Sequence, residues 1–238
     1  MTPLDLALAV AVVTLGATLQ GTVGFGANLV AAPLLTLIDP QLVPGPIVVV
    51  ALLLNALVVR RERDSVALAE VRWALVGLVP GTLAGAAALA LLPEDGLSLF
   101  FAIVVLVAVA LSMSGLHPPM RPPALLGAGT ASGFMGTVTA IGGPPIAMMY
   151  QRQPGATLRG TLGRFFLVSG LLSLAGLLAV GRIGLTEVGV AALLVPGVLA
   201  GYGISRLLVG HVDRGHTRAV VLALSALSAV TVIVTTLR

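Results

Sequence analysis

Long apolar runs follow one another through almost the whole chain, with few charged residues between them. The stretch 99–111, LFFAIVVLVAVAL, has no polar atom in its side chains. Of the 238 residues, 58% are hydrophobic and 9% are charged, whereas a soluble domain carries roughly a quarter of charged residues. Such a chain cannot cover a water-exposed surface with polar groups, so the sequence predicts an all-α polytopic membrane protein.

Proline, glycine and charged residues divide the chain into ten apolar segments, five in each half. Spanning the bilayer takes about 20 helical residues, and the third to fifth segments of each half are long enough or nearly so. The first two of each half are shorter and contain glycines, which predicts broken helices or a re-entrant hairpin. The segments are 4–19, 28–38, 44–59, 72–92, 97–114, 124–138, 144–151, 161–180, 187–209 and 218–236. No signal peptide is expected, because MTPLD lacks a positive charge.

The two halves resemble each other. VPGTLAG at 79–85 recurs as VPGVLAG at 195–201, and GTV at 21–23 recurs at 136–138. The two matches keep the same order, and their offsets differ by one residue, which favours an internal duplication. We expect an N-terminal repeat at 1–116, a cytoplasmic connector at 117–123 and a C-terminal repeat at 124–238, all in one membrane domain.

The basic residues, all thirteen of them arginine, indicate how the repeats are oriented. Three arginines follow the third segment of the first half, but the equivalent loop of the second half has one. The first-half loops 39–43 and 93–96 contain no basic residue, whereas their second-half counterparts carry two arginines each. Under the positive-inside rule this swap predicts inverted repeats with both termini extracytoplasmic, in the inner or plasma membrane of the cell. The arginines interpreted as loop charges that set the topology are Arg60, Arg61, Arg63, Arg152, Arg159, Arg214 and Arg218.

Two glycine-rich breaks occupy equivalent places in the halves, QGTVGFGAN at 20–28 and GTVTAIGGPP at 136–145. Broken helices at matching points of inverted repeats are typical of transport sites. Each break opens a helix, whose N-terminal N–H groups and positive dipole end favour an anion. Pro144 suits a first helical turn, and Asn28 takes the corresponding place in the first break as an N-cap or a side-chain donor. The predicted substrate-binding residues are Gln20, Thr22, Gly24, Phe25, Gly26, Asn28, Thr137, Thr139, Gly142, Gly143, Pro144 and Arg164.

Several of these residues have a purely structural alternative. The glycines of the breaks would also serve close helix packing, which is the interpretation we adopt for Gly81, Gly85, Gly197 and Gly201. Arg164, the deepest predicted charge, serves either substrate electrostatics or anchoring at the interface. Asn55, a lone amide near a helix end, is interpreted as a packing hydrogen bond.

Catalysis is not expected. The chain has no Cys, its three His lie in or beside loops, and its carboxylates fall at predicted segment ends. The sequence therefore does not indicate a nucleophile, a general base or a set of metal ligands in one pocket. No cofactor, metal or nucleic acid is expected. The expected partners are a small anion and the lipid bilayer, with protons as a candidate coupling ion and homo-oligomerisation left open. A lipid-handling or structural subunit, and more distantly a membrane-embedded hydrolase or transferase, are the alternatives.

At the breaks the sequence resembles the TauE/SafE family of membrane permeases. GTVGFGANLVAAPLL in the first half and GFMGTVTAIGGPPIAMMY in the second carry the resemblance, together with size and duplication. It implies export or uptake of a small sulfur-containing anion, such as sulfite, sulfoacetate or taurine. Only six positions carry over: Gly24, Phe25, Gly26, Gly142, Gly143 and Pro144. The first break reads GFGAN, where many members are richer in glycine.

Overall fold

A computed structural model describes residues 1–65, 68–92, 94–116, 118–150 and 152–212. These residues form α-helices, one short 3-10 helix and no strand. The elements are α1 (Pro3–Val23), α2 (Ala27–Ile38), η1 (Pro40–Leu42), α3 (Gly45–Arg61), α4 (Leu68–Leu91), α5 (Glu94–Met113), α6 (Pro122–Thr139), α7 (Gly143–Tyr150), α8 (Gly155–Ala179) and α9 (Leu185–Val212). The predicted segment 218–236, with Arg214 and Arg218, lies outside the described residues.

Four helices are long and apolar enough to cross a membrane: Pro3–Val23, Val71–Leu91, Gly155–Ala179 and Leu185–Gly210. The all-helical fold is therefore confirmed for the described residues, and it is compatible with the expected polytopic membrane protein. The first segment is longer than predicted, because α1 begins at a capping box and runs on to the first break. In that box the Asp5 N–H donates to Thr2 Oγ1 over 3.2 Å, and the Thr2 N–H donates to Asp5 Oδ2 over 2.8 Å.

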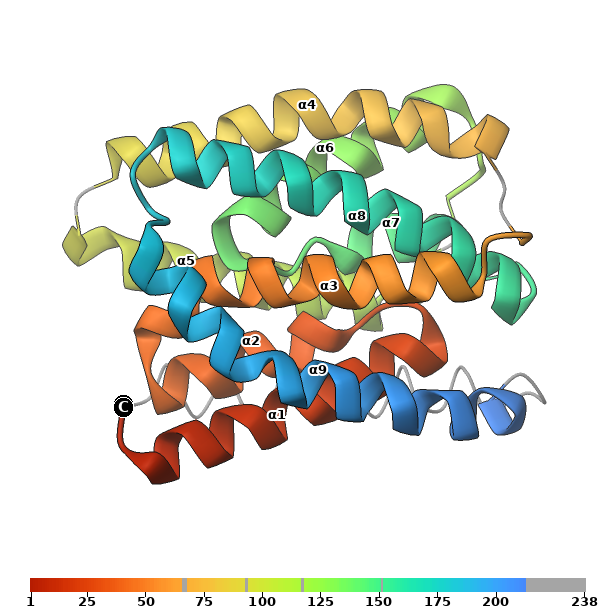
Figure 1. The fold of residues 1–238 in the computed structure, drawn as a ribbon. Helices are drawn as coiled ribbons and strands as arrows, with labels where there is room; N and C mark the ends of the chain where they lie inside the picture. The colour runs from red at the N-terminus through yellow and green to blue at the C-terminus, as the bar shows by residue number, and fades with distance from the viewer. Residues whose placement is uncertain (66–67, 93, 117, 151, 213–238) are drawn as a thin grey trace.

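Two helical hairpins enter the molecule from opposite ends (Figure 1). α2 leads back to the end at which α1 begins, and α7 leads back to the other end, where α6 begins. The long helices α3, α4, α8 and α9 run from end to end beside them. The glycine breaks are the turning points of these hairpins. Of the short segments, α2 and α7, with 12 and 8 residues, do not reach the length of a full crossing, whereas α1 does.

Glycines bring the long helices into backbone contact with the hairpins. α4 packs along α6, and α9 packs along α1. A Cβ at Gly81 would collide with the carbonyl oxygen of Thr130, and one at Gly201 would collide with that of Thr14. These positions have the close-packing role that their spacing predicted.

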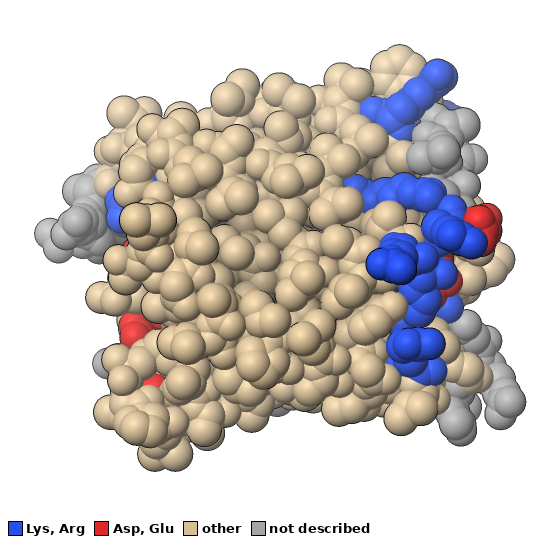
Figure 2. Space-filling view, viewed as in Figure 1, with Lys and Arg blue, Asp and Glu red and all other residues tan. Residues whose placement is uncertain are grey.

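Arginine gathers at one end of the molecule in the view of Figure 2. This is the end at which α3 ends and α8 begins in Figure 1. We call it the Arg-rich end. The face between the two ends is built from uncharged side chains in this view, as a surface in contact with lipid requires.

Candidate functional site

Backbone in the left-handed region interrupts both hairpins. Gly24, with φ of 105°, caps α1 and donates its N–H to Gln20 O over 2.7 Å, and Gly26, with φ of 96°, precedes α2. In the second hairpin Ala140 takes the equivalent place after α6, with φ of 60°. Glycine adopts positive φ without penalty, but alanine pays roughly 1–2 kcal/mol. The surrounding structure therefore holds the second break in place, as is common at functional sites.

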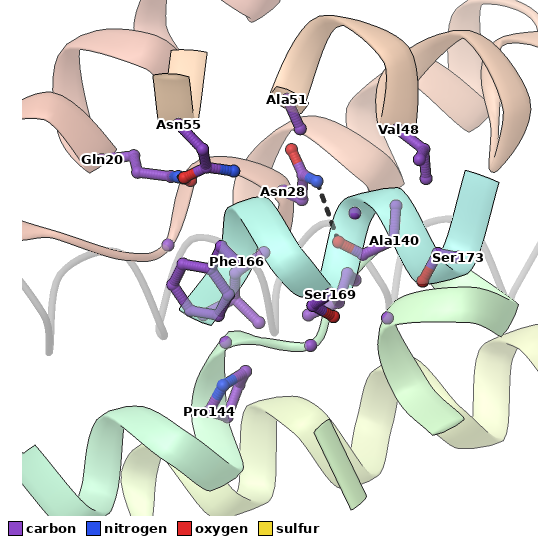
Figure 3. Close-up of a pocket in the computed structure, with 17 residues that line it drawn as sticks. Gln20, Asn28, Val48, Ala51, Asn55, Ala140, Pro144, Phe166, Ser169 and Ser173 are labelled. Atoms are coloured by element: carbon purple, nitrogen blue, oxygen red, sulfur yellow. Dashed lines mark hydrogen bonds between the residues drawn. The ribbon is translucent and has the colours of Figure 1, made fainter. Parts of the chain in front are cut away.

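A cavity of about 60 Å³ lies where the two breaks meet α3 and α8. Figure 3 shows Gln20 and Asn28 from the first hairpin, Ala140 and Pro144 from the second, Asn55 from α3 and Ser169 from α8 around this space. None of the lining residues is charged. Its polar side chains are therefore amides and hydroxyls, and residues of the first turns of α2 and α7 lie at its wall.

Hydrogen bonds fix the polar side chains of the cavity. Gln20 Nε2 donates to Asn55 Oδ1 over 2.6 Å. Asn28 Nδ2 donates to Ala140 O over 2.8 Å and so joins the two breaks (Figure 3). Of the two roles expected for Asn28, the N-cap is wrong, because the N-cap of α2 is Gly26 and Asn28 is the second residue of the helix. Its amide instead acts as a side-chain donor to the other half.

Six of the predicted site residues line the cavity: Gln20, Gly26, Asn28, Gly142, Gly143 and Pro144. They come from both halves of the chain, so folding brings together what the sequence places more than a hundred residues apart. The atoms nearest to a Cβ added at Gly143 belong to Phe25 and Phe166, at 3.7 and 3.8 Å, which is ordinary van der Waals contact. At Gly142, by contrast, an added Cβ would lie 2.6 Å from Ser132 O. Gly143 thus leaves space for a ligand, and Gly142 serves the packing of the break.

The other predicted site residues do not line the cavity. The Thr22 hydroxyl donates to Thr18 O over 2.6 Å and that of Thr139 to Met135 O over 2.9 Å, both within their own helices. The hydroxyl of Thr137 bonds to that of Ser173 at 2.9 Å.

Phe25 is buried behind Gly143, and Gly24 packs on the backbone of Arg159. Arg164 Nη2 donates to Arg63 O over 2.8 Å, a contact at the Arg-rich end that fits the anchoring alternative.

Several lining residues were not selected by the sequence analysis, among them Asn55, Phe166, Ser169 and Ser173. Asn55 does make the packing hydrogen bond expected of it, to Gln20, but it also faces the cavity. Ser169 and Ser173 stand four residues apart, on one face of α8. This pair of hydroxyl side chains in an apolar segment is the sequence feature that could have identified them as site residues.

Arg159 is not the loop charge that the sequence suggested. It lies in the first turns of α8 with its side chain 3% exposed, and Nε is 2.9 Å from Glu62 Oε1. Arg61 is also largely buried and also pairs with Glu62, at 2.9 Å. Sequence alone missed this burial because a residue near a segment end is buried or exposed according to what packs on it.

Among the described residues no group of His, Asp or Glu lies close enough together to hold a metal ion. The chemistry that the cavity offers is hydrogen bonding from neutral groups and helix termini.

A family model described as "Sulfite exporter TauE/SafE" matches residues 8–232, nearly the whole chain. The chain belongs to the TauE/SafE family. No curated protein and no solved structure gives a match. TauE/SafE proteins are membrane transporters of anions, so an anion and a bilayer are the partners that membership implies, in agreement with the resemblance noted at the breaks.

Proposed function

We propose that the chain carries a small anion, sulfite or an organosulfonate such as sulfoacetate or taurine, across the cell membrane by alternating access. The observation that supports this most directly is the uncharged cavity at which the N-termini of α2 and α7 converge. The first turn of a helix has N–H groups without intrahelical acceptors and carries about half a positive charge. In α7 the second and third residues are Pro144 and Pro145, which have no N–H, so the Gly143 N–H and the positive dipole end act there beside the first turn of α2. These groups stabilise an anion without a fixed cation that would hinder its release.

The size of the cavity favours the smaller anions. Since one water needs on the order of 10–15 Å³ in the same measure, the 60 Å³ cavity holds only a few water-sized groups. Sulfite is close to that size, whereas sulfoacetate and taurine require the walls to move apart. We therefore expect inorganic sulfite to be carried better than the organosulfonates.

Protons are the candidate coupling ion, and no Asp, Glu or His lines the cavity. Any proton that moves with the substrate would then travel on the anion itself. A pH gradient would act through the protonation of sulfite in solution.

Helix pairing supports an inverted repeat as the basis of this mechanism. Exchanging the halves relates α1 to α6 and α4 to α9, and these helices pack as α1 on α9 and α6 on α4. α3 packs on its own counterpart, α8. Such symmetry gives two related arrangements of the same contacts, one open to each side. Under the positive-inside rule the clustered arginines favour an orientation with the Arg-rich end in the cytoplasm and the N-terminus outside.

Uptake into liposomes tests the proposal. Purified protein is reconstituted, and the uptake of labelled sulfite, sulfoacetate and taurine is followed with and without a pH gradient. We expect saturable transport of at least one of them, and thermal stabilisation of the protein by the same anion. No transport and no stabilisation with any of these anions would contradict the assignment.

Gly143→Leu provides the matching variant. A leucine side chain there would fill the cavity, so transport should be abolished while the protein stays folded, since an added Cβ approaches its nearest neighbours, Phe25 and Phe166, no closer than 3.7 Å. Gly189→Leu is the control, because an added Cβ meets nothing within 4 Å at that exposed position of α9. Normal uptake by the Gly143 variant would rule out this cavity as the site.

A further inference from the structure

A compact cluster of charges closes the Arg-rich end of the helix bundle. Glu62 Oε1 lies 2.9 Å from Arg61 Nε and 2.9 Å from Arg159 Nε. The three side chains are 12%, 15% and 3% exposed for Glu62, Arg61 and Arg159. The next pair along the chain, Arg63 with Asp64, is at 3.5 Å and 76% and 89% exposed. We call Arg61, Glu62 and Arg159 the buried ion cluster.

The buried ion cluster holds the end of the first half-helix. Arg159 Nη1 donates to Thr22 O over 3.2 Å, and Arg61 Nη2 donates to Gly21 O. These carbonyls belong to the last turn of α1, where no intrahelical N–H remains for them and the dipole end is negative. Two guanidinium groups therefore cap a helix that stops at the first break.

The cluster also ties together the four helices around that end. Arg61 Nη1 donates to Ser205 Oγ of α9 over 3.2 Å, and the guanidinium lies 5.5 Å from the Tyr202 ring centre. Arg61 ends α3, and Arg159 lies near the beginning of α8. Through Glu62 the cluster thus links α1, α3, α8 and α9.

Its position relative to the cavity is the decisive point. Asn55 of α3 lines the cavity, and Arg61 follows six residues later, roughly 9 Å along the helix. Phe166 of α8 also lines it, and Arg159 precedes Phe166 by seven residues, roughly 10 Å. On both helices the buried ion cluster therefore stands one to two turns from the cavity, on the side of the Arg-rich end.

The opposite end has no ion pair in the described part of the chain; its Arg182 donates only to a backbone carbonyl, that of Leu89. All three ion pairs among the described residues lie at the Arg-rich end, at Arg61–Asp64 and Arg159. We infer that the buried ion cluster is the gate of the Arg-rich side: while Glu62 joins the two arginines, α1 is held against α3 and α8 and the cavity is closed to that side. Opening requires the pairs to separate, which is feasible because a buried pair gains little over its hydrated charges.

This inference rests on the proposed transport function, but it is testable without a substrate. The chain contains no Cys, so Ala51→Cys places a single thiol in the cavity wall. A membrane-impermeant methanethiosulfonate is applied to one side or the other of oriented membrane vesicles. Asp64→Cys, made separately, reports which side the Arg-rich end faces, because Asp64 is 89% exposed.

Glu62→Gln on the Ala51→Cys background removes the shared carboxylate and leaves two arginines facing each other. We expect labelling from the Arg-rich side to become about tenfold faster or more, and labelling from the other side to stay the same or slow down. Glu62→Asp keeps the charge but shortens its reach, so it should give a smaller increase and serves if the Gln variant does not fold. Asp64→Asn, which breaks the exposed pair next to it, should change neither rate.

Unchanged labelling in both Glu62 variants would overturn the gate, and so would an equal increase from both sides, which would mean general loosening. The gate and the transported anion fail separately. Faster one-sided labelling without uptake of any sulfur anion leaves the gate standing and removes the substrate assignment. Sulfite uptake with labelling unaffected by Glu62→Gln would remove the gate and leave the substrate assignment standing.

Discussion

Asn55 accepts a hydrogen bond from Gln20 in the wall of the cavity, and this makes it a sensitive probe of the sign of the ligand. Asn55→Asp keeps the accepting oxygen, so the contact with Gln20 and the fold should survive. It adds a negative charge beside the site. Two like charges roughly 6 Å apart at an effective dielectric of about 20 repel by about 3 kcal/mol, so we expect KM for anion uptake to rise at least tenfold.

Asn55→Ser serves as the neutral comparison for this measurement in liposomes. It removes the hydrogen bond with Gln20 but adds no charge, so its effect on KM should be smaller than that of the Asp variant. If Asn55→Asp transports the anion as well as the unaltered protein does, the cavity does not bind an anion.

At the level of the helices, the close packing of α4 on α6 and of α9 on α1 is the main contribution to stability that we consider. Gly81→Val would press a branched side chain against the backbone at Thr130. We expect a loss of stability on the order of 1–3 kcal/mol or more, measured as a lower midpoint of thermal unfolding in detergent. Gly203→Val is the control, since nothing lies within 4 Å of an added Cβ there. Equal stability of the two variants would show that the close contact of α4 with α6 is not needed.

The elements themselves followed closely from the sequence, with the second to ninth predicted segments each matching one helix of the structure. The pairing of these helices did not follow from the sequence. Gly81 and Gly201 indicate that another helix packs closely at these positions. Nothing in the local sequence indicates that the contacting residues are Thr130 and Thr14. The length of α1 was also underestimated, because polar Gln20 and Thr22 at its end lower the apparent hydrophobicity without ending the helix.

Topology is the prediction that belongs to the whole molecule. If the Arg-rich end is cytoplasmic, Asp64→Cys should be labelled by an impermeant thiol reagent only from the inside. Thr186→Cys, at the exposed beginning of α9 on the other end, should be labelled only from the outside. Labelling of both positions in intact cells from the same side would contradict the arrangement. The native chain without Cys gives the background.

The sequence by itself determined that this is a helical membrane protein, where its helices break, and which family it belongs to. These are properties of local composition and periodicity, which the bilayer enforces because no buried backbone group can remain unpaired there. Half of the predicted site residues do line the cavity, since the glycine-rich breaks that end helices are visible in the sequence.

Only the tertiary structure decided which groups share the cavity and which charges are buried. Ser169 and Asn55 become site residues because α8 and α3 cross the breaks, and Arg159 becomes part of a buried ion cluster because the end of α1 and Glu62 pack against it. Burial and proximity of this kind depend on contacts between segments far apart in the chain, and no local pattern encodes them.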